Sequence, residues 1–289
     1  MHSEDSLPIG ELARRTGVNP VTLRAWERRY GLLVPERTPK GHRLYSALHV
    51  EKVQAILQWL ERGASVGQVR DLLENRNEDS PRLEGDWHAR CQQLIEAIAN
   101  LAQRSLDQQL NQAMALYPAS TLCEQLLLPL LERLEQRWRK HFDASLEQAF
   151  FHTWLRSKLG ARVYHDNHSL EGPPVLLATT LDTPFDAQLW LAAWLLSSSG
   201  FAVEVLEQPV GGKQLLHAIA QLAPRALVLH LGPRIDLQAL APLRDVTLTK
   251  LLGGASVFIH EERLHSLELP ALQLFETPQG ALRLLQQSR

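Results

Sequence analysis

The sequence predicts a multidomain chain whose N-terminal part is α-helical and whose C-terminal part is α/β. Its 289 residues exceed what one small core needs and allow two or three compact domains. Apolar residues follow a helical spacing up to about residue 168, and strands alternate with helices after residue 173. With 45% hydrophobic and 21% charged residues, the composition excludes wholesale disorder. We therefore expect domains of different structural class within one chain.

The charge is divided unevenly along the chain. Residues 1–76 hold 12 Lys and Arg against 9 Asp and Glu, a net charge of +3. The remainder holds 18 against 23, a net charge of −5. A basic head on an acidic body indicates a module that binds a polyanion, joined to a body that does not.

Cysteine content and hydropathy bear on the cellular compartment. The two cysteines, Cys91 and Cys123, are too few for a disulfide framework or a metal cage, which favours a reducing environment. Residues 1–8 are polar and acidic, unlike a signal peptide. The longest apolar runs, such as Leu189–Leu196, are shorter than the roughly 20 residues that span a bilayer. We expect a cytoplasmic protein without membrane contact.

Two short helices joined by a glycine turn are predicted near the N-terminus. Gly17 provides the turn, and Asn19 followed by Pro20 is a favoured start for the second helix. Leu23 and Trp26 are expected to pack on the first helix. The predicted outer face then carries Thr22, Arg24, Arg28 and Arg29. In such a helix-turn-helix, the outer face of the second helix enters the major groove of DNA.

The next segment, Gly31 to Tyr45, predicts a wing made of two short extended pieces around a Pro39-Lys40-Gly41 turn. Its Arg and Lys side chains would contact phosphates, and its hydroxyl and imidazole groups would add hydrogen bonds to the DNA backbone. A solvated basic loop is the alternative. The candidate DNA-contacting residues of the whole head are Thr22, Arg24, Arg28, Arg29, Tyr30, Arg37, Thr38, Lys40, Gly41, His42, Arg43 and Tyr45.

Residues 7–75 resemble the winged-helix head of MerR-type transcriptional regulators, with two closing helices at 48–62 and 66–73. The matching positions are the run Asn19–Leu33, then Pro35, Arg37, Gly41, His42, Arg43 and Tyr45. The resemblance implies a domain over 1–75 that binds double-stranded promoter DNA and acts on RNA polymerase. Members of this family usually bind pseudo-palindromic operators as dimers, often through a long helix after the head. Here a breaker-rich linker follows at 76–85, so homo-oligomerisation is expected from the body.

The body predicts two further domains. Residues 86–168 contain four stretches of helical periodicity separated by short breaks, which indicates a four-helix bundle. Residues 173–289 alternate strands and helices of about ten residues, which indicates a parallel sheet of Rossmann-like (flavodoxin-like) type. The expected strands are Val175–Thr180, Phe201–Leu206, Ala226–Leu231 and Val246–Leu252, with Val257–Ile259 as a possible further strand. The expected helices are Ala187–Ser198, Lys213–Ala223, Leu237–Leu243 and Pro278–Gln287.

The body also resembles cobalamin-binding modules. The run Leu122–Trp138 is similar to the third helix of the four-helix cap that precedes cobalamin-binding domains, and Gly253-Gly254 follows a late strand as in those domains. A MerR-type head on this pair of domains is the architecture of the light-sensing CarH/LitR branch and of the MlrA-type regulators. This resemblance implies a site that includes Trp138, Phe185, His230, Gly253 and Gly254.

The cobalt ligands that the resemblance implies are missing from this sequence. Phe185 and Gln188 stand where cobalamin binders have a His and a Gly after the first strand. Arg139 and the pair Gln148-Ala149 stand where the light-sensing members have a His and a Glu-His pair. His230 stands at the place of a serine. Phe and Ala have no donor atom, and Arg does not lose its proton.

Three histidines have alternative interpretations. His168 is expected in a solvated loop, although Asp166-x-His168 mimics a cobalamin signature. His141 could replace an upper cobalt ligand or be an exposed residue at a helix end. His230 could line a pocket or be a hydrogen-bonded core histidine.

We therefore expect a DNA-binding transcriptional regulator whose effector and oligomerisation module has kept the cobalamin-domain fold but binds no cofactor. A separate sensor or anti-regulator protein would then carry the signal. The alternatives are a cobalamin-dependent photosensory regulator with unusual ligation and a corrinoid-carrying enzyme component. No catalytic motif and no metal-ligand cluster is found, so no catalytic residue and no metal site is assigned.

Overall fold

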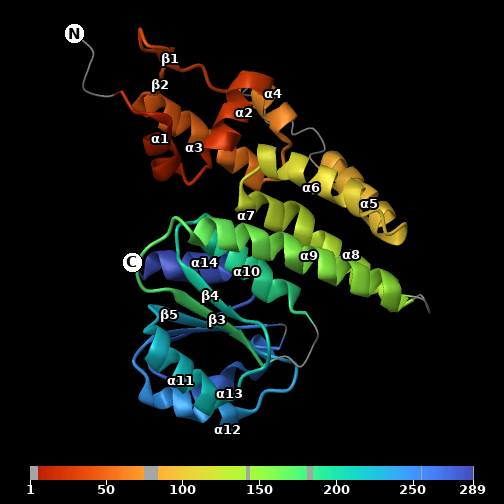
Figure 1. The fold of residues 1–289 in the computed structure, drawn as a ribbon, viewed down its shortest axis with the longest axis vertical. Coiled ribbons are helices and arrows are strands. Elements are labelled where there is room, and N and C mark those ends of the chain that lie inside the picture. Colours follow the sequence, from red (N-terminus) through yellow and green to blue (C-terminus); the bar gives the residue numbers. More distant parts are fainter. Residues whose placement is uncertain (1–5, 75–83, 141–143, 181–184, 255, 289) are drawn as a thin grey trace. The chain divides into compact units, whose positions relative to one another are not determined.

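The computed structural model describes residues 6–74, 84–140, 144–180, 185–254 and 256–288. The chain forms two compact units, residues 1–150 and residues 151–289 (Figure 1). Within the described residues, no helix combines the length and the apolar composition that crossing a bilayer requires.

The first unit begins with the predicted winged helix-turn-helix. Gly17 (φ +71°) and Gly31 (φ +62°) end the first two helices, because a left-handed residue closes a helix at little cost when it is glycine. A short hairpin and two longer helices follow. The elements are α1 (Ile9–Thr16), α2 (Pro20–Tyr30), β1 (Glu36–Arg37), β2 (Arg43–Leu44), α3 (Ala47–Glu61) and α4 (Val66–Glu74).

The predicted helical body follows in the same compact unit. It contains α5 (Glu84–Ala99), α6 (Gln103–Leu116), α7 (Ala119–Leu122), a π-helical turn (Cys123–Leu127) and α8 (Leu128–Trp138). The last three run on without a break, and Pro129 lies just after the π-helical turn. Proline has no N–H to donate within a helix, so a widened turn next to it lets the helix continue.

Helix α9 (Ala144–Asn167) is the fourth helical segment, and the division between the two units falls inside it. Its C-terminal half is tied to the second unit by polar contacts. The side-chain amide of Asn167 donates to the carbonyl oxygen of Val203 at 2.7 Å, and the hydroxyl of Ser197 donates to Asp166 at 3.0 Å. The end of the predicted 86–168 segment therefore shares a compact unit with the α/β fold.

The second unit contains a parallel sheet, as predicted. Within the described residues its strand order is β4-β3-β5-β6-β7, and every neighbouring pair is parallel. The first strand in the chain, β3, lies next to the edge strand β4, and the later strands β5, β6 and β7 follow on its other side, which is the flavodoxin-like order. The strands are β3 (Val175–Thr179), β4 (Val203–Leu206), β5 (Ala226–His230), β6 (Thr249–Gly253) and β7 (Leu272–Phe275).

Helices cover both faces of this sheet. Helices α10 (Ala187–Ser198) and α14 (Pro278–Gln287) lie on one face, and α11 (Gly212–Leu222), α12 (Leu237–Leu240) and α13 (Glu261–His265) lie on the other (Figure 1). Because the sheet is covered on both faces, β3 and β5 are buried along their whole length. Helices lie between successive parallel strands along the chain, as βαβ units require.

One predicted element is wrong and one strand was missed. Val257–Ile259 is a possible strand in the sequence, but Phe258–His260 forms a turn of 3-10 helix. Gly254 (φ +125°) turns the chain away from the sheet directly after β6, and Phe258 and Ile259 are exposed. The last strand is instead Leu272–Phe275, a short edge strand with a weak apolar pattern.

Gly253 allows the close packing of β6 against β7. A Cβ atom at this position would overlap the ring of Phe275, which is its partner in the parallel register. Gly160 in α9 offers a contrast, because a Cβ there would lie 3.6 Å from the ring of Trp190, an ordinary contact distance.

We predict opposite effects of two matched glycine substitutions on stability. Gly253→Ala should lower the free energy of unfolding by about 1–3 kcal/mol, because overpacking in a rigid core is costly. Gly160→Ala should raise it by about 0.5–1 kcal/mol, because alanine favours the helix. Urea denaturation followed by circular dichroism measures both. An unchanged midpoint for Gly253→Ala would contradict the packing described here.

Candidate nucleic-acid interface

Helix α2 presents a basic face to solvent. The amide N–H of Val21 donates to the side-chain oxygen of Asn19 at 2.8 Å, which caps the helix start. Leu23 and Trp26 are completely buried, as predicted. The exposed side chains of the helix include Arg24, Arg28 and Arg29. Arg24 and Arg28 are one turn apart and share a face, whereas Arg29 points to a different side.

The predicted outward position of Thr22 is wrong. Its side chain is only 2% exposed, because position 22 lies three and four residues before Ala25 and Trp26 and shares their buried face. Val21, which is 55% exposed, faces outward in the first turn instead.

The wing is a tight hairpin with an exposed basic tip. The amide of Thr38 donates to the carbonyl of His42 at 2.9 Å, and the amide of His42 donates to the hydroxyl of Thr38 at 3.0 Å. Gly41 (φ +82°) supplies the left-handed residue of the turn. Lys40 and His42 are exposed at the tip, so both can reach a phosphate.

Glu27 joins the wing to the recognition helix. Its carboxylate accepts from Nε of Arg43 at 2.6 Å and from Nη2 of Arg37 at 3.4 Å. The hydrogen bond to Glu27 raises the pKa of Arg43 further. Arg37 keeps 56% of its side chain exposed, whereas Arg43 keeps 25%. Arg43 therefore positions the wing, and Arg37 remains accessible to DNA.

Tyr45 and Tyr30 are less accessible than the sequence suggested. Tyr45 is 1% exposed, and its hydroxyl has no hydrogen-bond partner among the described residues. Burial raises the pKa of this hydroxyl. The predicted contact of Tyr45 with the DNA backbone is wrong for this conformation, because the ring packs edge-on against His49, with 5.5 Å between centroids. Tyr30 is half-buried.

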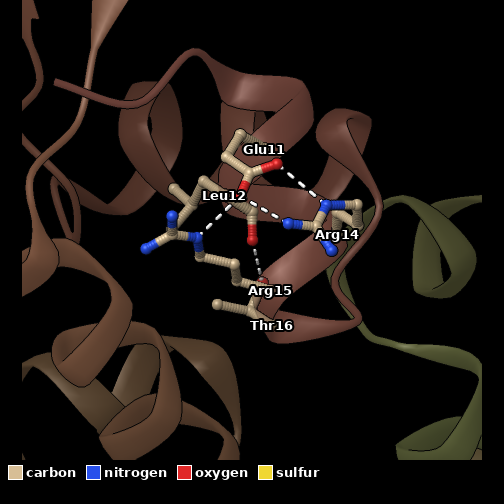
Figure 2. Close-up of polar contacts among 5 residues, drawn as sticks. All are labelled: Glu11, Leu12, Arg14, Arg15 and Thr16. Atoms are coloured by element: carbon tan, nitrogen blue, oxygen red, sulfur yellow. Dashed lines mark hydrogen bonds and ion pairs between the residues drawn. The ribbon is translucent and has the colours of Figure 1, made fainter.

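The basic residues of α1 are partly neutralised. The carboxylate of Glu11 accepts from Nε and Nη2 of Arg14 at 2.8 and 2.7 Å and from Nε of Arg15 at 2.7 Å (Figure 2). These hydrogen bonds lower the pKa of Glu11 to about 2, so the carboxylate stays ionised in the physiological range. The arginines of α1 are therefore partly compensated, whereas Arg24 and Arg28 on α2 and Lys40 at the wing tip have exposed side chains.

The head is docked on the helices that follow it, which sequence reasoning missed. The indole N–H of Trp26 donates to the carbonyl oxygen of Leu116 at 2.8 Å. The indole N–H of Trp87 donates to the carbonyl oxygen of Gly63 at 2.9 Å, and the amide of Val66 donates to the hydroxyl of Tyr117 at 3.4 Å. The sequence signal for this docking was the presence of three large aromatic residues, Trp26 in the head and Trp87 and Tyr117 in the helices that follow it.

The candidate effector residues lie in two places. Trp138 belongs to the first unit, where its indole N–H donates to Glu147 at 3.3 Å. Phe185, His230, Gly253 and Gly254 belong to the second unit. His141 lies outside the described residues.

His230 forms a buried network that sequence reasoning did not find. Its Nδ1–H donates to the carboxylate of Asp186 at 2.5 Å, and both residues are at least nine-tenths buried. The hydroxyl of Thr179 and the amide of Leu189 also donate to Asp186, at 3.1 and 3.0 Å. The network joins the C-terminal ends of β3 and β5 to the start of α10. Asp186 and His230 are 44 residues apart, so no local motif signals their pairing.

The two glycines and Phe185 are also used in packing. A Cβ at Gly254 would overlap the carbonyl oxygen of Leu231, so this glycine is required by the turn itself. Phe185 is half-buried, and its ring centroid lies 5.1 Å from that of His152 on α9. Burial lowers the pKa of His152, which favours its neutral form.

The described residues offer no metal centre. Among them, no group of three His, Cys, Asp or Glu side chains is arranged to hold an ion. Cys91 and Cys123 are buried thiols, and burial raises the pKa of Cys123 to about 12. Such thiols are inert as nucleophiles and as metal ligands.

Comparison with known proteins gives two family matches. Residues 7–76 match the model of the MerR HTH family of regulatory proteins, and residues 90–161 match the model of a B12 binding domain. The chain is 32% identical over 218 residues to the HTH-type transcriptional regulator MlrA of Escherichia coli (strain K12), covering 75% of this chain and 82% of that protein.

Two further relatives come from Myxococcus xanthus. The HTH-type transcriptional repressor CarA is 27% identical over 230 residues, covering 78% of this chain and 76% of that protein. The HTH-type transcriptional repressor CarH is 24% identical over 240 residues, covering 77% of each.

We predict that two exposed basic residues differ in their effect on DNA binding. Lys40→Ala should weaken binding by a similar factor on all DNA sequences and reduce the slope of log K against log salt by about 1, because one phosphate contact is lost. Arg14→Ala should change this slope much less, because Arg14 lies on α1, outside the recognition helix and the wing, and is paired with Glu11. Fluorescence anisotropy over a salt series measures both slopes. Equal losses for the two variants would contradict this assignment of the basic surface.

Proposed function

Because the chain belongs to the MerR family of HTH transcriptional regulators, we propose that it binds promoter DNA sequence-specifically as a homo-oligomer, in the cytoplasm and without catalysis. The observation that carries this proposal is the joint exposure of Arg24, Arg28 and the wing tip. These groups form one basic surface on a recognition helix and a wing that Glu27 holds together.

The residues of this surface divide by role. Arg24 and Arg28 lie on the outer face of α2 and would enter the major groove, where Arg contacts guanine through two hydrogen bonds. Arg37, Lys40 and His42 would contact phosphates and set the register of the head on the duplex. Regulation of transcription then requires RNA polymerase as a further partner.

Self-association is proposed for the body of the protein. One head of about 70 residues offers a small interface, whereas specific sites of this class use two half-sites about one helical turn apart. The chain continues after α4 into α5 to α8, which form one compact unit with the head. These helices and the α/β unit are the surfaces available for a second copy of the chain.

We predict that the full chain is at least a dimer in the absence of DNA. Light scattering over a range of concentrations should give a mass at least twice that of the 32.6 kDa chain. The whole chain is needed, because removal of the head would expose the surface that covers Trp26. A monomer at every concentration would contradict self-association through the body.

Cobalamin binding does not fit the residues of this chain. Phe185 has no donor atom for cobalt, and its ring already packs against that of His152 on α9. Phe275 lies directly against Gly253, and Asp186 already binds Nδ1 of His230. These contacts support a module that has kept the fold of its relatives without this cofactor.

A regulator of this kind needs another source for its signal. We propose that a separate sensor or anti-regulator protein binds the helical body or the α/β unit. No light response would then be intrinsic to this chain.

We predict no specific binding of adenosyl-, methyl- or hydroxocobalamin in calorimetric titrations of the full chain. Binding should be weaker than about 10 μM, which corresponds to roughly −7 kcal/mol. Stoichiometric binding tighter than this would overturn the proposal and favour a cobalamin-dependent photosensory regulator. In that case, titration of His230→Ala would test whether His230 is the replacement ligand.

A further inference from the structure

Val21 is an exposed apolar residue in the first turn of the recognition helix. Its side chain is 55% exposed, whereas its neighbours Thr22 and Leu23 are 2% and 0% exposed. Val21 precedes Arg24 by three residues and Arg28 by seven, so the three side chains share one face of α2. The Nε–H of Arg28 donates to the carbonyl oxygen of Arg24 at 3.4 Å, which directs Arg28 back toward the N-terminal end.

The chemistry of Val21 differs from that of its two basic neighbours. In a helix-turn-helix, the N-terminal residues of the second helix contact base edges in the major groove. A branched apolar side chain cannot form a hydrogen bond there. The apolar group that base edges present in the major groove is the C5 methyl group of thymine.

Other exposed apolar side chains of the head lie off this face. Val34 is 76% exposed and lies between the end of α2 and β1, where its carbonyl oxygen contacts Nε2 of His49 at 3.1 Å. Leu48 is 72% exposed and lies in the first turn of α3. Among the described residues of the head, Val21 alone combines large apolar exposure with a place on the recognition helix.

We propose that Val21 is a specificity-determining residue that contacts the C5 methyl group of a thymine in each operator half-site. This inference rests on the proposed reading of DNA by α2 and names a base that the two arginines cannot select. The thymine should lie next to a base contacted by Arg24 or Arg28, because the three side chains are contiguous.

The test removes the methyl group of thymine and the side chain of Val21 in separate experiments. An operator is first enriched from random duplex DNA with the full-length protein, and each thymine is then replaced singly by deoxyuridine. Deoxyuridine keeps every hydrogen-bonding group of thymine and lacks only the methyl group. For the unmodified protein, one thymine position in each half-site should be sensitive. A single replacement at such a position should weaken binding about fourfold, which is the effect of one methyl group removed from water.

Val21→Ala should bind the original operator about sixteenfold more weakly, because the contact is lost in both half-sites, and should lose its response to deoxyuridine at that position. Val34→Ala is the matched control, with the same substitution at an exposed site off the helix face. It should keep both the affinity and the deoxyuridine response of the unmodified protein.

Two results would overturn the inference. The unmodified protein could respond to deoxyuridine at no thymine, or Val21→Ala could keep the full response. In either case operator binding itself is intact, so the proposed function stands while the role of Val21 fails. If no sequence is enriched from the random DNA, the proposed function fails and this inference fails with it.

Discussion

The arrangement of the head depends on the burial of Trp26. Its side chain is completely buried, and its indole N–H is bonded to the carbonyl oxygen of Leu116, 90 residues along the chain. A buried donor without a partner costs about 1–3 kcal/mol, so the helix has a strong preference for this one position against α6. The recognition helix is therefore held by the helical body as well as by the head. A change in α6 would be transmitted directly to the helix that carries Arg24 and Arg28.

The same helix organises its other neighbours. Leu23 packs inside the head, and Glu27 holds Arg43 and Arg37 of the wing. One helix of 11 residues thus packs on the core and on the body, holds the wing along one edge, and exposes Arg24 and Arg28 on its remaining face. Because the wing is attached through Glu27, displacement of α2 would move the exposed arginines of the helix and of the wing together.

The parts of this fold that could be predicted are those encoded by local patterns. The glycine turn at Gly17 and the Asn19-Pro20 start predicted the helix-turn-helix, and continuous apolar runs predicted β3 and β5. Thr22 was misplaced because a helix that is buried on a wide face leaves few outward positions, and a small β-branched residue suits either side. The docking of Trp26, the strand β7 and the Asp186–His230 pair depend on contacts between segments far apart in sequence. No short motif encodes such contacts.

The α/β unit uses the carboxyl edge of its sheet for internal contacts. In a doubly wound sheet, ligands bind at the carboxyl ends of the strands where the strand order reverses, which here is between β3 and β5. That place holds the buried network of Thr179, Asp186 and His230. A buried carboxylate is costly to desolvate, and here a hydroxyl, a backbone amide and an imidazole N–H compensate that cost only while β3, β5 and α10 stay together. A ligand entering this edge would have to break those bonds, so the network stabilises the unit in the absence of any ligand. The polar groups at this edge are directed inward, which supports the proposal that another protein regulates the chain through the outer surfaces of this unit.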